Sequence, residues 1–460
     1  MSRLIAVSAT FVALVGACFA AEGSGKAASD STTRTVTFTR DVAPILQARC
    51  QECHRAGSMA PMSLVTYEET RPWAKSIRQR VITRQMPPWH IDPSVGVQKF
   101  KNDISLTQDQ INTIVRWVDS GAPMGDAKDM PPPVKWPAAN EWKAAKELGE
   151  PDLVIKSEPY TMPAHHQDVW WRPTSNIPLT EPRWVRAVEM RPGTPAGRRI
   201  THHAVTYLVQ DDPDSISPIA TSDQDKRGLL MEWAVGKGYD LYRPNTGKLL
   251  LPGSQISWDV HIHAVGEEIR DDVELGIWLY PKGQEPKYRT YLTGFQATRG
   301  FLTSNGSQVR GSRNMDIPPN SVIATDNYTV LKRAAILENF QPHMHLRGKA
   351  MQVEAILPDG TAQVISYVDH FNFNWMTNYI YADDAAPYLP KGTTIHVTAW
   401  YDNTSNNPNN PDPDQWVGFG DRTVDEMGHA WMNVTYISDE EYNAWAAKHR
   451  SKLEADAAFK

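Results

Sequence analysis

The chain has 460 residues, and its 47 Lys and Arg against 53 Asp and Glu give a formal net charge of −6 at pH 7. No block of basic residues stands out, so the sequence lacks the electrostatic footprint of a protein that binds nucleic acid or an anionic membrane surface. The length allows roughly two to four domains, and 34 Pro, 28 Gly and 16 Trp favour short strands and many turns over a helical bundle.

Residues 1–20 have the layout of a signal peptide. Arg3 precedes an apolar run that ends at Ala20 and is too short to cross a bilayer comfortably. Cleavage after Ala20 would release an exported, periplasmic protein. Alternatively, the three residues before Cys18 complete a lipobox-like pattern, and a lipid on Cys18 would hold the protein at the membrane surface. Residues 21–35 predict a flexible tether, and we expect no transmembrane helix elsewhere.

The chain has three cysteines, and two of them belong to one motif. Cys50 and Cys53 are followed directly by His54, which completes the CxxCH signature of c-type haem attachment. Two thiols at this spacing can form thioethers with the haem vinyl groups, and the histidine then meets the iron. A chance match or a two-cysteine redox pair is the alternative. No cysteine follows Cys53, so the rest of the chain must fold without disulfides.

The second axial haem ligand is expected to be a thioether or an imidazole from the distal side. We predict Met86, because the amphipathic segment 73–81 can carry it across the haem and two prolines stiffen the loop that follows. His90 is the alternative. Two other methionines follow the haem motif too closely to reach around the ring: Met59 and Met62.

A last helix is predicted to close this N-terminal region. Thr107 and Gln110 form a capping-box pattern at its start. Its apolar stripe consists of Ile111, Ile114, Val115 and Val118. We therefore expect a small all-α cytochrome c domain of the class I type over residues 36–130, followed by a Pro-rich, semi-rigid linker over residues 131–150.

From Pro151 onward the sequence changes to short strands separated by turn signals such as Arg191-Pro192-Gly193. This pattern predicts two all-β sandwich domains of the jelly-roll kind, over residues 151–300 and 301–437. A polar helix is expected over residues 438–460. The predicted fold class is thus a multidomain chain, with an all-α cytochrome c domain followed by two all-β sandwiches.

Histidine clusters in the β region predict metal sites. They are His202-His203, His261-Ile262-His263, His343-Met344-His345 and Met427-Gly428-His429. Alternate side chains of a strand leave on the same face, so His343 and His345 can bind one ion together. His202 and His203 are adjacent and can share an ion only at a bend or bulge, or through different ring nitrogens. Imidazole and thioether ligands without a thiolate suit copper that cycles between Cu(I) and Cu(II).

These four clusters, in this order, resemble the copper type II monooxygenases, the family of peptidylglycine α-hydroxylating monooxygenase and dopamine β-monooxygenase. The likeness covers roughly residues 150–437. It also includes Leu346-Arg347-Gly348 after the third cluster and Asp425-Glu426 before Met427. The haem region resembles the cytochrome c modules that are fused to bacterial members of this family.

The resemblance implies two copper ions, one in each sandwich, that face each other across a solvent-filled cleft. His202, His203 and His261 would hold an electron-storing copper, with His263 as the alternative third ligand. The catalytic copper, which binds O2 and faces a small organic substrate, would be held by His343, His345 and Met427. The family's chemistry hydroxylates a C–H bond, and each turnover needs two single electrons. We expect the haem on His54 and Met86 to relay them from an external donor.

Several departures from the family bear on the substrate. The peptide-amidating enzyme has an arginine two residues before the third cluster, where it pairs the substrate carboxylate, and this chain has Gln341 there. Asp259 replaces a glutamine, while His429 and Trp431 replace an asparagine and a tyrosine. Because a bidentate arginine is a strong carboxylate anchor, its loss predicts that the protein is not a peptide amidase. Trp431 with Trp375 is compatible with an apolar pocket, or with ordinary core packing.

Two other functions are compatible with the same residues. The chain could be a non-catalytic haem and copper protein for electron transfer or copper binding, which keeps the ligands but lacks a substrate pocket. It could also be a structural sandwich stabilised by zinc, in which case metal analysis would find zinc and no copper. Only the enzyme should consume O2 in step with a hydroxylated product.

Overall fold

The computed structural model describes residues 34–458, apart from 57, 59, 137–140, 216, 219–227, 235, 298 and 303–307. The predicted signal peptide, Cys18, Met59 and nearly all of the predicted tether lie outside these residues. Within the described ranges, no helix combines the length and the apolar character that a bilayer-spanning helix needs.

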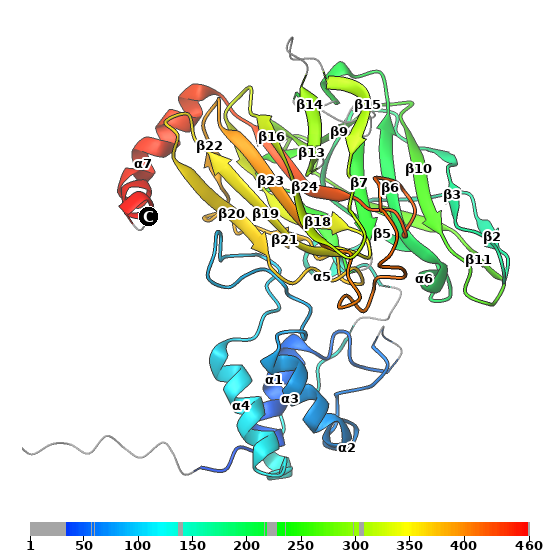
Figure 1. Ribbon diagram of the computed structural model, residues 1–460, viewed down its shortest axis with the longest axis vertical. Coiled ribbons are helices and arrows are strands. Elements are labelled where there is room, and N and C mark those ends of the chain that lie inside the picture. The colour runs from blue at the N-terminus through cyan, green and yellow to red at the C-terminus, as the bar shows by residue number, and fades with distance from the viewer. Residues whose placement is uncertain are drawn as a thin grey trace, which may run out of the picture.

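Short helices form the N-terminal part of the chain, below the sheets in Figure 1. They are η1 (Phe38–Val42), α1 (Ala43–Arg49), α2 (Tyr67–Thr70), η2 (Arg71–Trp73), α3 (Ala74–Ile82), α4 (Gln108–Asp119) and η3 (Ala127–Asp129). The capping box predicted for α4 is present, because the Thr107 hydroxyl accepts the N–H of Gln110 and the Gln110 side chain accepts the N–H of Thr107. Phe38, Leu46 and Trp117 belong to the small core between these helices.

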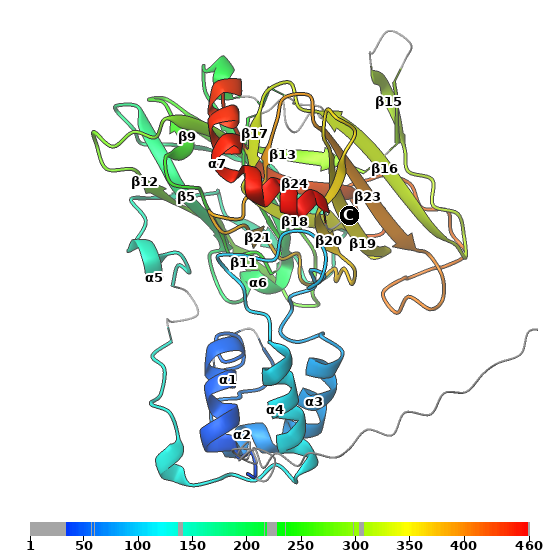
Figure 2. The same ribbon diagram turned by 90° about the vertical axis from the view of Figure 1, so that its left-hand side faces the viewer.

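Between α3 and α4 the chain leaves the helices and packs against the sheets. The N–H of Asp92 donates to the carbonyl of Tyr367 (2.8 Å), and the N–H of Lys101 donates to the carbonyl of Ile380 (2.8 Å). Trp89 is buried in the same hydrophobic core as the C-terminal strands. Figure 2 shows this connection rising from the helices to the strands. The connection between α3 and α4 therefore attaches the helices to the C-terminal half.

One sheet of eleven strands runs through both halves of the β region. Its main path is β1 (Leu153–Lys156), β12 (Val273–Leu279), β5 (Arg183–Pro192), β9 (Thr246–Leu250), β13 (Tyr288–Gln296), β24 (Gly428–Tyr436), β17 (Ala335–Leu337) and β22 (Tyr388–Leu389). Three further strands pair with members of this path: β8 (Tyr239–Leu241), β18 (Asn339–Met344) and β21 (Tyr379–Ile380).

Two smaller sheets cover this sheet, one in each half. The first contains β3 (Val169–Trp171), β10 (Gln255–Ile262), β6 (Thr201–Val209), β7 (Leu229–Ala234) and β4 (Thr174–Asn176). The second contains β16 (Val322–Val330), β23 (Thr394–Asp402), β19 (Gly348–Ile356) and β20 (Ala362–Val368). Strict alternation of buried and half-exposed residues along β23 is typical of a strand with one face on a core.

The remaining elements are short or peripheral. Two two-stranded antiparallel sheets are β2 (Tyr160–Met162) with β11 (Ile269–Asp271) and β14 (Arg299–Leu302) with β15 (Gln308–Asn314). The other helices are α5 (Ala145–Leu148), α6 (Gly197–Ile200), η4 (Pro213–Ser215) and α7 (Asp439–Ala458). In α7, the Trp445 ring stacks on the Tyr388 ring at a centroid distance of 4.4 Å, which docks the C-terminal helix on β22.

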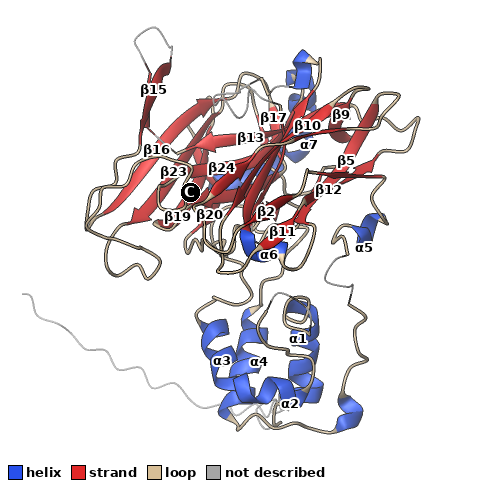
Figure 3. Cartoon of the chain, turned by 90° about the vertical axis from the view of Figure 1, so that its right-hand side faces the viewer, coloured by secondary structure: helices blue, strands red, loops and turns tan. Residues whose placement is uncertain are grey.

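The predicted fold class is wrong. The structure is mostly β-sheet, with 36% strand and 17% helix, and the part of the chain that it describes contains no sizeable all-α cytochrome domain (Figure 3). The segment from Trp89 to Lys101, inside the predicted helical range 36–130, packs with the C-terminal strands. The two halves of the β region are also not separate, because β13, inside the predicted range 151–300, pairs along its length with β24.

Both faces of β24 are buried, and this places the two halves in contact. Ala430 and Met432 point into the C-terminal core. Trp431 points the other way and packs with Val205 of β6 and Leu229 of β7, from the N-terminal half. The histidines of β6 and of β18 therefore lie on surfaces that face each other.

Candidate metal centre

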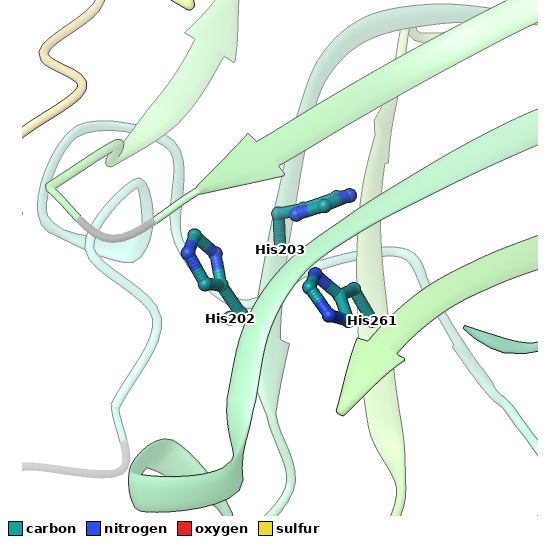
Figure 4. A group of neighbouring side chains, drawn as sticks. All are labelled: His202, His203 and His261. Atoms are coloured by element: carbon teal, nitrogen blue, oxygen red, sulfur yellow. The ribbon is translucent and has the colours of Figure 1, made fainter. Parts of the chain in front are cut away.

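Three histidines of the N-terminal half, His202, His203 and His261, lie together and are called the N-terminal triad below. Each offers one ring nitrogen such that all three atoms lie within 4.8 Å of one another (Figure 4). A bulge explains how neighbouring residues share this site. His203 pairs with His261 and Thr201 pairs with Ile262, so His202 has no partner in the ladder and turns toward the same side.

Neighbouring groups orient the His261 ring. Its Nε2–H donates to the carboxylate of Asp168 (2.9 Å), and the Trp170 ring stacks on it at 4.6 Å and 8°. The hydrogen bond fixes the proton on Nε2 and leaves the Nδ1 lone pair free to bind a metal. His263 lies just beyond the end of β10, with its ring centroid 6.3 Å from that of His202, and does not belong to the group within 4.8 Å. The geometry thus favours His261 over His263.

The C-terminal set comprises His343, His345 and Met427, all of them buried. The two imidazole centroids lie 5.5 Å apart at the end of β18. The Nδ1–H of His345 donates to the carbonyl of Asp425 (3.1 Å), which leaves its Nε2 atom for a metal. Met427 precedes β24 and lines a pocket together with His343 and His429.

The two sets of ligands are neighbours. The ring centroids of His203 and His343 lie 5.8 Å apart. Phe373 contacts both sets, with centroid distances of 4.7 Å to His202 and 6.4 Å to His345. The two sets, which the family resemblance implied to face each other across a solvent-filled cleft, are thus in ring contact at His203 and His343. The five imidazoles form one continuous cluster between β6, β10 and β18.

The cluster contains polar atoms that the protein itself does not satisfy. Among the described residues, buried ring nitrogens without a hydrogen-bond partner include both nitrogens of His202 and the Nδ1 atoms of His203, His261, His263 and His343. Each such atom costs about 1–3 kcal/mol when it stays unpaired. Metal ions bound between these rings would satisfy them, and soft imidazole and thioether donors without a thiolate fit copper.

Burial also fixes the protonation of these imidazoles. It lowers the pKa of His202, His203 and His343 well below the ordinary value, and the neighbouring histidines lower it further. Burial lowers the pKa of His345 to about 4. The rings are consequently neutral near pH 7, which is the form that binds metal.

A pocket adjoins the cluster. Its lining residues include Trp170, Trp431, Val205, Arg172, Asp259 and Glu232. Arg172, the one cation among these lining residues, pairs with Asp259 (3.1 Å). Burial raises the pKa of Glu232 to about 7, while Lys237, 3.6 Å away, and the Gln341 side chain lower it. The pocket lining therefore combines aromatic rings with carboxyl groups, of which Asp259 and Glu232 lie beside a cation.

The haem motif occupies a turn directly after α1. The N–H groups of Cys53 and His54 both donate to the Cys50 carbonyl (3.2 and 2.9 Å). The Nδ1–H of His54 donates to the Met62 carbonyl (3.3 Å), which leaves Nε2 for an iron. Both thiols are free, and burial raises the pKa of Cys50 to about 12. A reactive redox pair would have a lowered thiol pKa, and these thiols do not. Haem attachment at this turn stays a prediction.

The predicted distal ligand and its alternative lie in different surroundings. Met86 follows α3 and is partly buried, and its role as a haem ligand stays a prediction. His90 is buried, its N–H donates to the Tyr379 hydroxyl (3.1 Å), and the charges nearest its ring are His370 and Asp369 of the C-terminal half. His90 therefore belongs to the β region rather than to the haem turn.

Sequence reasoning missed several residues that shape the site. Asp168 orients His261 across 93 residues of chain, and Phe373 fills the space between the two ligand sets. No local pattern marks either residue. Glu426 was part of a quoted motif, yet its role is visible only in the structure, where its carboxylate accepts backbone N–H groups beside two ligands.

Comparisons with known proteins leave the family open. No family model matches the chain, and no curated protein matches it. Similar solved structures include the major capsid protein P2 of bacteriophage PM2, with 9% identity, 62% of this chain and 97% of that chain covered, and a TM-score of 0.25. Another is PNGF-II, with 11% identity, 62% and 65% covered, and a TM-score of 0.27. At such scores neither likeness bears on fold or function.

Proposed function

We propose that the protein is an exported dicopper monooxygenase with a covalent haem c, and a divergent member of the copper type II monooxygenases. It hydroxylates a C–H bond of a small organic substrate with O2. The single observation that carries the proposal is the buried cluster in which neutral imidazoles with unpaired ring nitrogens and one thioether, Met427, surround a pocket.

The reaction fixes what the residues must provide. One O2, one substrate C–H bond, two electrons and two protons give a hydroxylated product and one water. Copper would supply one-electron redox chemistry and O2 binding here, held by the N-terminal triad and the C-terminal set. The bulge at His202 and the hydrogen bond from His261 to Asp168 hold the first three imidazoles, and the Asp425 carbonyl holds His345.

Haem c at the Cys50–His54 turn would relay single electrons from an external donor. The turn lies on the side of the helices that approaches the N-terminal half. The charge of Lys143 acts on Cys53, and the charge of Glu52 acts on Tyr239 in β8. Stopped-flow mixing of ferrous haem with oxidised copper tests this role. If haem oxidation is slower than turnover, the haem is not the donor.

The pocket supports a substrate without a carboxylate anchor. Gln341 stands where the amidating enzyme has arginine, the cation Arg172 is paired with Asp259, and the buried Glu232 repels anions when ionised. We therefore expect no hydroxylation of a glycine-extended peptide. Robust activity on such a peptide that is lost in Gln341→Ala would overturn this part of the proposal.

Coupled turnover tests the function itself. The holoprotein, supplied with a reductant and a panel of aromatic and aliphatic compounds, should consume O2 in step with a hydroxylated product that carries one atom from ¹⁸O2. A protein that binds copper and haem yet never couples O2 uptake to a product, across a broad panel, is an electron-transfer or copper-binding protein instead. The mass of the protein purified from its host tests export, because cleavage after Ala20 and lipidation of Cys18 give different masses.

A further inference from the structure

The ladder between β18 and β24 ends immediately before two ligands. Its pairs run from Gln341 with Trp431 to Met344 with Gly428. The next pair in the same register would be His345 with Met427, and neither residue belongs to a strand. The main-chain hydrogen bonds of the sheet thus stop where the imidazole and the thioether must be held at a fixed spacing.

Beyond the end of the ladder, one carboxyl side chain accepts the backbone N–H groups. Glu426 is fully buried, and its Oε1 atom accepts the N–H of His345 and the N–H of Met427, the latter at 3.0 Å. Its Oε2 atom accepts the N–H of Arg347 (2.9 Å). One side chain therefore joins the backbone of both ligands. Burial raises the pKa of Glu426 to about 8, and the three N–H groups that it accepts lower it.

Other contacts fix the same two segments in orientation. The Tyr401 hydroxyl donates to the Met427 carbonyl (3.1 Å), and a Cβ at Gly428 would lie 2.3 Å from that hydroxyl. The Arg347 guanidinium donates to the Val424 carbonyl (2.7 Å). The peptide of Met427 is thus held through its N–H by Glu426 and through its carbonyl by Tyr401.

We propose that Glu426 is the positioning residue of the C-terminal set, which sets the spacing between the His345 imidazole and the Met427 thioether. The proposal rests on the proposed copper function. It requires the carboxylate, because a glutamine at this position would turn its NH2 group toward a backbone N–H. An aspartate would be one methylene too short to reach all three N–H groups.

The test compares Glu426→Gln with Glu338→Gln, each loaded with Cu(I). Glu338 is the matched control, because it is also fully buried and accepts the Thr435 hydroxyl and the Arg243 N–H, away from the ligands. X-ray absorption reports sulfur ligation, and competition with a Cu(I) chelator reports affinity. Glu426→Gln should lose sulfur scattering and bind one of two copper ions roughly 10–100-fold more weakly, while Glu338→Gln keeps both properties.

Glu426→Asp is the second variant, and it keeps the charge if Glu426→Gln does not fold. It should show an intermediate loss of affinity with weakened sulfur scattering. Wild-type sulfur scattering and affinity in a folded Glu426 variant overturn the positioning role alone. A wild-type protein that binds no copper, or binds it without sulfur, overturns the proposed function as well.

Discussion

The two sets of ligands are built in different ways. The N-terminal triad stands on paired strands, where a bulge in β6 and the ladder to β10 place all three nitrogens within 4.8 Å of one another. The C-terminal set stands where a ladder ends, and a buried carboxylate holds it together. The spacing of the triad thus depends on main-chain pairing, whereas the spacing of the C-terminal set depends on one buried side chain. We expect side-chain substitutions outside the ligands to disturb the C-terminal set more than the triad.

The largest expected effect follows from removing the thioether. Met427→Ala should lower hydroxylation by more than the roughly 10–100-fold that loss of an outer partner causes. Copper at the N-terminal triad and covalent haem should remain, because Met427 contributes to neither. Product analysis, copper content and the haem spectrum together check this. Activity within a few-fold of wild type would remove Met427 from the site.

A pair of histidine variants distinguishes the third ligand of the triad. His261→Ala should bind one copper fewer than wild type, since it removes a member of the group within 4.8 Å. His263→Ala serves as the control and should keep both copper ions, because its ring lies at the periphery of the cluster. Metal analysis after gel filtration measures the difference. The reverse result would make His263 the ligand.

Stability of the metal-free protein should depend on pH. Burial lowers the pKa of His203 and His343 in the folded state below the value near 6.5 that they regain on unfolding. The unfolded chain then binds more protons below about pH 6.5, so stability is present above that pH and declines as the pH falls. Thermal unfolding from about pH 8 to pH 5 checks this. The stability of His203→Gln should depend less on pH than that of the wild type. An equal slope in both proteins would contradict the assignment.

The smallest expected effect concerns the orientation of His261. Asp168→Asn keeps the shape of the partner but removes its charge, so copper at the triad should bind about 10-fold more weakly. Sulfur scattering from the C-terminal set provides the internal control and should not change. If the variant alters sulfur ligation instead, the two sets are not built independently, and the comparison between them fails.

Local chemistry was the part of the fold that sequence could predict. The capping box of Thr107 and Gln110 is present. A bulge lies at His202, which is one of the alternatives that its adjacency to His203 had left open. All four residues of the predicted apolar stripe of α4 pack on the helical core, Val115 and Val118 while partly buried. The covered face also includes Trp117, which is fully buried and was not part of the predicted stripe. A periodicity argument places residues on a face but does not say how wide the covered face is.

Packing between distant segments could not be predicted from the sequence. The segment from Trp89 to Lys101 carries no sign that it leaves the helices for the C-terminal core, and this is where the predicted all-α domain failed. The closeness of His203 and His343 depends on how β6 faces β18, which no motif encodes. Motif order could therefore indicate the ligand types, while the partners Asp168, Phe373 and Glu426 required the structure.

Metal and haem stoichiometry of the purified holoprotein tests the central claim most directly. Elemental analysis and a pyridine haemochrome assay should find two copper ions and one haem per chain, with no zinc. Zinc in place of copper, or copper that dialysis removes completely, would contradict a dicopper centre built from the N-terminal triad and the C-terminal set.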